Sequence, residues 1–387
     1  MEPQRRRRLA DELREAAPTW ADLAARHGTP LLVLDPREVQ RRYAELQELL
    51  PYIRFHYAVK ALPHPAVIAA VVSRDGWFDA ATSQEVDHLR TLGVDMRRVV
   101  HTHPVKKSAH IDHAFDAGVR TFVVDSIGEV EKFDARHRDA GILVRLAFPD
   151  PTAKSDLSAK FGVSTEHAEL VVKQLLSRGM RVSGFSFHVG SQGRGIEPFA
   201  RAIDETIDLM SRVESSSGIR FDTLDIGGGF PVSYREFMPS ITEIASVIDT
   251  ALAPVRDRVT VLAEPGRYVV ASAATLLTSV VGSAERDGQV WHYLDDGVYG
   301  SYSNVLAEDV HPAILTLSEI QGESVGPMRP VVLAGPTCDS VDVVARDYPM
   351  PHLAIGSILV SPMMGAYTAV SASRFNGLPP TPIVVVR

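Results

Sequence analysis

The sequence predicts a (β/α)8 barrel joined to a smaller β-rich domain. Eight short apolar runs alternate with helical stretches over ~230 residues, which is the pattern of such a barrel. After about residue 275, helical periodicity is weak and short strands are separated by turns. A doubly wound open sheet would carry its glycine-rich turn after the first strand, whereas here the run 227–229 follows the seventh. The barrel is expected over 36–274 and the β-rich domain over 275–387, with 1–35 contributing.

The composition is that of a globular protein and excludes several kinds of partner. The chain has 387 residues, 45% of them hydrophobic, and a formal net charge of −8, which argues against nucleic acid or an anionic membrane as a partner. Its single cysteine rules out an intrachain disulfide, and the N-terminus lacks an apolar signal core, so we expect a reducing, cytoplasmic compartment. The run Arg5–Arg8 is interpreted as a solvated helix end.

The elements follow from periodicity in chain order. Residues 1–28 indicate one or two short helices, 31–34 a strand at the edge of the β-rich domain, and 36–50 a helix. Barrel strands are expected at 53–59, 77–80, 98–102, 121–125, 142–147, 184–189, 223–227 and 259–263. Intervening helices include 83–92, 166–178 and 197–214. The strands expected in the β-rich domain are 274–281, 290–295, 312–318, 330–334, 353–360 and 381–386.

The reactive groups of such a barrel lie at the C-terminal ends of its strands. The first strand ends at Lys60. A partly buried lysine with a lowered pKa is a good nucleophile toward carbonyls, as a Schiff base with pyridoxal phosphate requires, while the alternative is a strand-end lysine in solvent. The other strand ends offer polar groups or glycines at Asp79, Arg145, His188, Ser191, Gly227, Gly228, Gly229, Glu264, Gly266 and Arg267.

Each of these groups has two interpretations. The glycine run 227–229 frees the backbone to approach an anion, or forms only a tight turn. Glu264 pairs with a cationic ring nitrogen, or with Arg267. His188 stacks on a cofactor ring, or is a satisfied core histidine. In the β-rich part, the Cys338-Asp339 turn places a thiol that can donate a proton beside a carboxylate that can bind an amine, or holds a small buried cysteine.

Several stretches in this order resemble the fold type III decarboxylases that depend on pyridoxal 5'-phosphate (PLP), in particular the ornithine decarboxylase branch. The resemblance covers about residues 30–387. The stretches are Tyr57-Ala58-Val59-Lys60, Phe78-Asp79, Lys160-Phe161-Gly162, Phe187-His188-Val189-Gly190-Ser191, Asp225-Ile226-Gly227-Gly228-Gly229-Phe230, Glu264-Pro265-Gly266-Arg267-Tyr268, Asp296-Gly297-Val298-Tyr299-Gly300, Gly335-Pro336-Thr337-Cys338-Asp339, Gly365-Ala366-Tyr367-Thr368 and Phe375-Asn376-Gly377.

The resemblance implies PLP-dependent decarboxylation of a basic amino acid, as in polyamine biosynthesis. Lys60 would form the Schiff base, His188 would stack on the ring, Glu264 would pair with the pyridine nitrogen and Cys338 would protonate the carbanion. No metal is expected. The phosphate would be held by Ser191, Gly229, Gly266, Arg267 and Tyr367. Further cofactor contacts are expected from Asp79, Arg145, Gly227 and Gly228, and substrate contacts from Tyr299, Glu308 and Asp339.

The resemblance also implies a head-to-tail homodimer in which Cys338 and Asp339 complete the site of the other subunit. One departure concerns the substrate, because Ala307-Glu308 stands where ornithine decarboxylases usually have Tyr-Asp. The substrate can therefore be ornithine, lysine, or a shorter or modified amino acid of a specialised pathway. A non-catalytic homologue that binds a regulator should have lost Lys60 or Cys338, and a related racemase needs a second base that the Cys-Asp turn does not supply.

Overall fold

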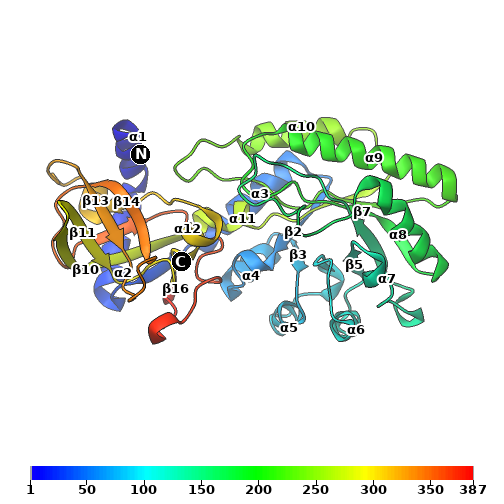
Figure 1. The fold of residues 1–387 in the computed structure, drawn as a ribbon, viewed down its shortest axis with the longest axis horizontal. Helices are drawn as coiled ribbons and strands as arrows, with labels where there is room; N and C mark the ends of the chain where they lie inside the picture. The colour runs from blue at the N-terminus through cyan, green and yellow to red at the C-terminus, as the bar shows by residue number, and fades with distance from the viewer. Residues whose placement is uncertain (1, 387) are drawn as a thin grey trace. The chain divides into compact units, whose positions relative to one another are not determined.

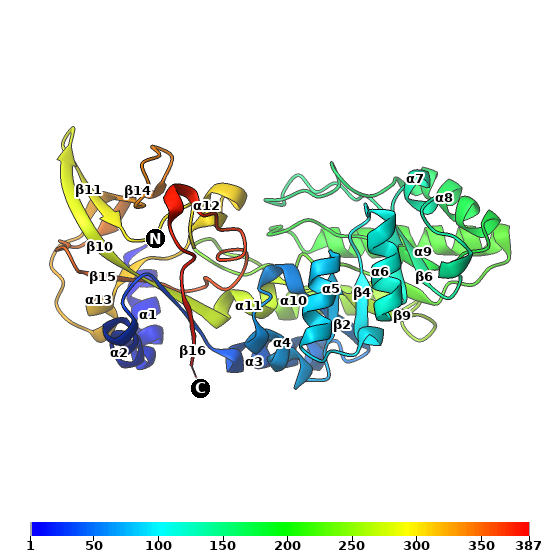
Figure 2. The same cartoon turned by 90° about the horizontal axis from the view of Figure 1, so that it is seen from below.

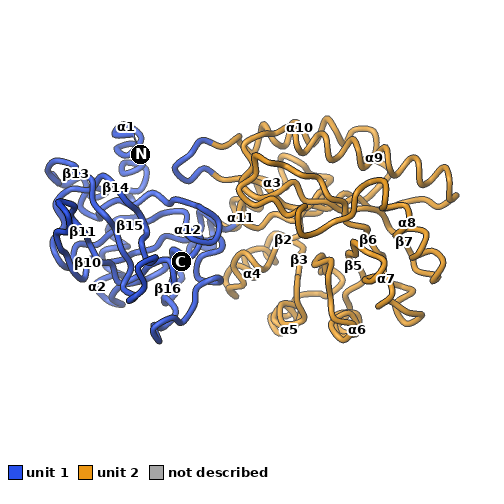
Figure 3. The backbone as a smooth tube through the Cα atoms, viewed as in Figure 1, with its two compact units in different colours: residues 1–38, 233–237, 270–387 blue, residues 39–232, 238–269 orange. Residues whose placement is uncertain are grey.

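The computed structural model describes residues 2–386, which divide into two compact units (Figure 3). Unit 1 comprises Met1–Glu38, Ser233–Phe237 and Val270–Arg387, and unit 2 comprises Val39–Val232 and Met238–Val269. Met1 and Arg387, the outer ends of the expected β-rich domain, lie outside the described residues. Within residues 2–386, no helix has the length and apolar character needed to cross a membrane.

Unit 2 is a closed barrel of eight parallel strands, as the sequence predicts (Figures 1 and 2). The last strand pairs with the first, with Ile53 opposite Val261, and closes the cylinder. Val100, Val123, Leu143 and Leu262 form one buried cluster from four of the strands. The strands are β2 (Ile53–Ala58), β3 (Trp77–Ala80), β4 (Val99–His101), β5 (Thr121–Val124), β6 (Gly141–Arg145), β7 (Arg181–Ser186), β8 (Thr223–Asp225) and β9 (Thr260–Ala263).

Helices connect these strands and bury one apolar face each. In α9, for example, Phe199, Ile203 and Met210 are buried at helical spacing. A reciprocal capping box between Ser240 and Glu243 begins α10. The helices are α3 (Pro36–Leu49), α4 (Pro65–Val72), α5 (Ser83–Thr91), α6 (Ser108–Ala117), α7 (Ile127–Val130), α8 (Thr165–Ser177), α9 (Glu197–Ser217), α10 (Ile241–Leu252) and α11 (Arg267–Val270).

Unit 1 is built on an eight-stranded mixed sheet. Its main path runs β12-β15-β10-β11-β13-β14, and the expected edge strand 31–34 pairs antiparallel with β10 and parallel with β16. The strands are β1 (Leu31–Leu34), β10 (Ala274–Arg286), β11 (Gln289–Leu294), β12 (Leu315–Thr316), β13 (Arg329–Ala334), β14 (Val343–Met350), β15 (Ile358–Ser361) and β16 (Ile383–Val385).

Local sequence patterns mispredict the secondary structure in four places of unit 1. The expected strand 312–318 is wrong beyond Thr316, because a capping box with Glu319 starts helix α13 (Leu317–Gln321). Strand β15 begins only at Ile358, after a turn. Strand β14 was not expected, since Arg346, Asp347 and Pro349 break its apolar alternation. Helix α12 (Ser303–Glu308) is likewise absent from the elements expected.

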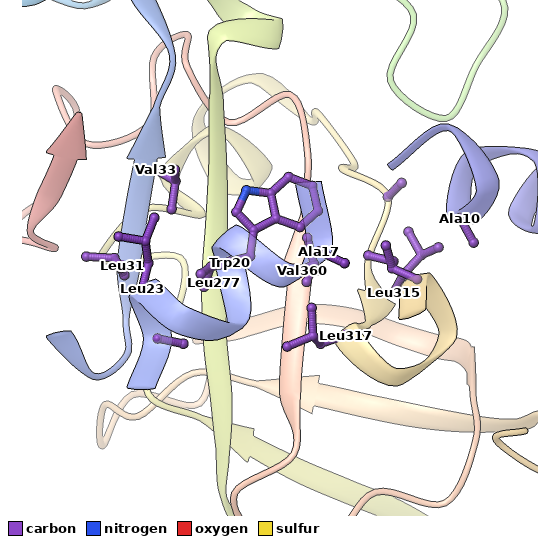
Figure 4. Packing of buried hydrophobic residues seen from close by; sticks show 13 residues of the cluster. Ala10, Ala17, Trp20, Leu23, Leu31, Val33, Leu277, Leu315, Leu317 and Val360 are labelled. Carbon is purple, nitrogen blue, oxygen red and sulfur yellow. The ribbon is translucent and has the colours of Figure 1, made fainter. Parts of the chain in front are cut away.

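Two N-terminal helices, α1 (Pro3–Leu13) and α2 (Ala17–His27), pack on the sheet of unit 1. Trp20 shares a buried cluster with Leu277 and Val360 (Figure 4). The expectation of a solvated Arg5–Arg8 run is wrong for Arg6, which is 5% exposed. Its guanidinium lies 2.7 Å from a carboxylate oxygen of Glu319, because a charge buried this deeply requires a partner.

Candidate active site

The lysine that ends the first barrel strand is paired with a buried acid. Lys60 lies in the turn Val59–Ala61 just after β2, and its Nζ donates a hydrogen bond of 2.7 Å to Oδ2 of Asp79 at the end of β3. The Asp79 side chain is fully buried, whereas the Lys60 side chain is 42% exposed. The amine therefore stands between solvent and a buried carboxylate.

The carboxyl groups of Asp79, Asp225 and Glu264 meet near this amine, and the first two are fully buried residues. Burial raises the pKa of Asp79, but the Lys60 ammonium and a hydrogen bond from Thr102 outweigh it and lower that pKa below its ordinary value. Burial, followed by the charges of Asp225 and Asp79, raises the pKa of Glu264 well above its ordinary value. Burial likewise raises the pKa of Asp225. An additional cation beside Glu264 would lower its pKa again, because an opposite charge favours the carboxylate.

The glycine turn after β8 forms a backbone cradle that side chains would fill. Gly227 and Gly229 have φ angles of 66° and 100°. A Cβ at Gly227 would lie 2.0 Å from the carbonyl oxygen of Phe187, and one at Gly229 would lie 2.5 Å from that of Gly190. A Cβ at Gly228 would lie 2.7 Å from the carbonyl oxygen of Glu264. Only glycine allows the three strand ends to approach this closely.

The His188 ring borders the same cradle, in the loop after β7. Its Nδ1 accepts a 3.0 Å hydrogen bond from the Gly190 N–H, which leaves Nε2 as the protonated nitrogen of the neutral ring. Burial, reinforced by the charges of Arg145 and Lys60, lowers the pKa of His188 to about 3. A neutral, flat ring is therefore available to stack on a cofactor at physiological pH. The stacking role of His188 stays a prediction, as does its alternative of an ordinary core histidine.

Two arginines belong to the same barrel end. Arg267, at the start of α11, is 5% exposed, and its Nη2 donates to Ser191 Oγ over 3.3 Å. Arg145 ends β6, and its guanidinium lies 5.3 Å from the centre of the Phe161 ring. Gly266 follows β9 at the same end of the barrel. All the predicted cofactor residues except Tyr367 therefore belong to unit 2. The guanidinium of Arg267 and the hydroxyl of Ser191 are groups suited to binding a phosphate.

The predicted substrate residues and Tyr367 are in unit 1. Tyr299 donates a 2.5 Å hydrogen bond to Asp339 Oδ2. Cys338 is exposed, so the interpretation as a buried small cysteine is wrong. Glu308 is the last residue of α12 and is half-buried, and Tyr367 adopts a left-handed φ of 54°.

Sequence reasoning assigned no role to Asp225, Thr102, Phe375 or Asn376. Asp225 ends β8 two residues before the glycine run begins, and its place at a strand end is a signal that the sequence contains. Thr102 carries no comparable signal, because its contact with Asp79 joins two different strands. Phe375 stacks on Tyr299, with ring centres 4.6 Å apart. The Asn376 side chain accepts a hydrogen bond from the Cys338 N–H.

The donor set fits PLP. A primary amine is placed beside a buried acid, the pKa of the neighbouring Glu264 is raised, and a glycine run that approaches two other strand ends lies at the same barrel end. A (β/α)8 barrel with these groups at its strand ends is a PLP-binding barrel. The chain belongs to the pyridoxal-dependent decarboxylase family, whose pyridoxal-binding domain matches residues 36–271.

Three relatives show the range of this family. A lysine/ornithine decarboxylase of Selenomonas ruminantium is 33% identical over 364 residues, which are 94% of this chain and 91% of the relative. The structure of a lysine/ornithine decarboxylase of Vibrio vulnificus complexed with cadaverine is 38% identical, with a TM-score of 0.90 over 96% of this chain and 98% of that one. Antizyme inhibitor 2 of Xenopus laevis is 31% identical over 366 residues, covering 91% of this chain and 79% of the relative.

Proposed function

We propose that this protein decarboxylates a basic amino acid, ornithine- or lysine-like, to the corresponding amine and CO2. The observation that carries the proposal is the Lys60 amine held 2.7 Å from Asp79, near Glu264, whose pKa is raised. When bound, PLP supplies the electron sink that accepts the electron pair left by CO2. The assignment of 36–274 as the cofactor domain and of 275–387 with 1–35 as the β-rich domain stays a prediction, as does a cytoplasmic location.

The residues of unit 2 are proposed to bind and orient the cofactor. Lys60 provides the amine that attaches it, and Asp79 orients this amine. Glu264 offers a carboxylate to a cationic ring nitrogen, which would release the proton that burial now favours. His188 covers the ring, and Arg145 lines the site. The phosphate is proposed to be held by Ser191, Gly229, Gly266, Arg267 and Tyr367, with further cofactor contacts from Gly227 and Gly228.

The residues of unit 1 are proposed to handle the substrate. Cys338 donates a proton to the substrate carbon after CO2 has left, and Asp339 and Glu308 bind the distal ammonium group. Tyr299 orients Asp339 through its hydrogen bond. We propose that two copies of the chain pair head to tail, so that Cys338 and Asp339 act in the site of the other copy.

A second candidate, a non-catalytic binding regulator, is favoured by the similarity to an antizyme inhibitor. Against it, the chain retains both Lys60 and Cys338. The discriminating test is CO2 release by the PLP-loaded protein with L-ornithine, L-lysine, L-arginine, 2,4-diaminobutyrate or diaminopimelate. Turnover of a basic amino acid that Lys60→Ala abolishes supports the enzyme. A normal cofactor absorbance band with no turnover of any of the five contradicts the proposed substrate class and favours a modified substrate or the regulator.

The shared site is tested by mixing two inactive variants. Lys60→Ala and Cys338→Ala subunits that exchange freely would form mixed dimers with one complete site, and should recover about a quarter of the wild-type activity. Size-exclusion chromatography with light scattering checks that the mixture is dimeric. Dimers that exchange subunits but recover no activity would contradict the sharing of Cys338 between subunits.

A further inference from the structure

One irregular segment of unit 1 contacts the predicted substrate residues at several points. We call residues 367–376, which run between β15 and β16, the tether segment. At its start, Ser371 Oγ lies 2.9 Å from Ser303 Oγ, at the beginning of α12. This helix ends in Glu308. The tether segment is thus anchored to the helix that carries a proposed substrate carboxylate.

The middle of the tether segment contacts the loop that carries Tyr299. The Ser373 N–H donates a 2.8 Å hydrogen bond to the Tyr299 carbonyl oxygen. Two residues further on, the Phe375 ring stacks on the Tyr299 ring at 4.6 Å with an interplanar angle of 27°. The Tyr299 hydroxyl in turn donates to Asp339. The stack therefore fixes the ring that orients the proposed amine-binding carboxylate.

The end of the tether segment reaches the proposed proton donor itself. The Cys338 N–H donates a 3.1 Å hydrogen bond to Oδ1 of Asn376. Asn376 has a left-handed conformation with a φ of 55°, which asparagine tolerates better than most residues and which aims its side chain at the turn. Cys338 is exposed and lies in the loop between β13 and β14, so this bond is a local restraint on its backbone.

We propose that Asn376 is a positioning residue, which, with Phe375 as its support, holds the Cys338 thiol where it can protonate the substrate carbon. The inference rests on the proposed function, because it takes Cys338 as the proton donor. If the thiol were displaced, water would have to supply the proton, and the bound cofactor's own carbon would compete with the substrate carbon for it. Where the cofactor carbon takes the proton, addition of water then releases an aldehyde and pyridoxamine phosphate, so that one cofactor is converted for each misplaced proton.

The test compares Asn376→Gly with Asp287→Gly in the PLP-loaded protein. Glycine keeps the left-handed backbone of residue 376 and removes only the acceptor. Asp287 is an exposed residue with a φ of 51° in the hairpin turn between β10 and β11, so its variant controls for the loss of a side chain at a left-handed position. Because Cys338 is the only thiol of the chain, its alkylation by iodoacetamide is measured without interference.

Asn376→Gly should lower kcat about tenfold or more and leave KM within about twofold, because a misplaced catalytic group costs rate more than binding. Pyridoxamine phosphate formed per CO2 should rise, and Cys338 should be alkylated several-fold faster. Asp287→Gly should match the wild type. Phe375→Leu, which removes the stack, should move the same three readouts in the same direction and provides a second variant if Asn376→Gly is unstable.

The inference is overturned if Asn376→Gly and Phe375→Leu match Asp287→Gly in kcat, product ratio and alkylation rate. A fall in kcat with neither more pyridoxamine phosphate nor faster alkylation would also overturn it, since the variant would then act elsewhere. If the wild type releases no CO2, the proposed function fails, and the alkylation rates alone decide whether Asn376 restrains the Cys338 turn.

Discussion

Replacing Lys60 with methionine should destabilise the barrel of the cofactor-free protein. The substitution removes the cation nearest to Asp79, whose side chain is fully buried, and leaves it close to the carboxyl groups of Asp225 and Glu264. Breaking a buried ion pair from one side typically costs ~3–5 kcal/mol. The Lys60 side chain is 42% exposed, so solvent screens the pair, and we expect a loss of about 2 kcal/mol in the free energy of unfolding.

The loss should depend on pH with a defined sign. In the wild type, Lys60 and Thr102 hold the pKa of Asp79 below its ordinary value, so their stabilising effect is present above the ordinary pKa and disappears as the pH falls through the folded-state pKa. In Lys60→Met, burial and the neighbouring carboxyl groups remain, and the pKa of Asp79 should rise. The difference between variant and wild type should therefore be largest at neutral pH and shrink in acid.

The assay is urea unfolding followed by circular dichroism, together with amide hydrogen exchange of peptides from β2 and β3. Exchange reports the barrel separately from unit 1. Lys173→Met, an exposed substitution on α8, serves as the control and should change neither measurement. Asp79→Asn should remove most of the cost of Lys60→Met in the double variant. The reasoning is refuted if Lys60→Met unfolds like Lys173→Met, or if its cost is the same with aspartate or asparagine at position 79.

Three further predictions concern other parts of the chain. Arg6→Met should cost ~3–5 kcal/mol in thermal unfolding at neutral pH. This cost should shrink in acid, because burial raises the pKa of Glu319 but Arg6 outweighs it and lowers that pKa. Burial lowers the pKa of Lys106 to about 7, so wild-type stability should rise from about pH 7 toward the ordinary lysine pKa of ~10.4, and Lys106→Met should lack this rise in pH-dependent unfolding. Gly228→Ala should weaken PLP binding in an absorbance titration. Gly218→Ala, with open space around its Cβ, should cost only ~1–2 kcal/mol of backbone strain and bind PLP normally.

The barrel was predictable because its signals are local. Each strand is a short apolar run that must be buried on both sides, and each helix shows its buried face at a fixed spacing, so neither depends on a distant partner. The same holds for Lys60 at a strand end and for the glycine run 227–229, whose backbone freedom belongs to the residue type. Strand β14 was not predictable in this way, because Asp347 and Pro349 break its apolar alternation. It is an edge strand that pairs with β13.

Charge states and orientations were decided by the tertiary structure. Arg6 stands in a run of four arginines, yet it is buried because Glu319, more than 300 residues away, supplies its counter-charge. The pKa of Glu264 is raised by burial and then by Asp225 and Asp79, all of which depend on closure of the barrel. The sequence determined which residue types end each strand, since that follows from local periodicity. Which of them shift one another's pKa, and which asparagine bonds to the Cys338 backbone, depends on contacts between distant segments that no local pattern encodes.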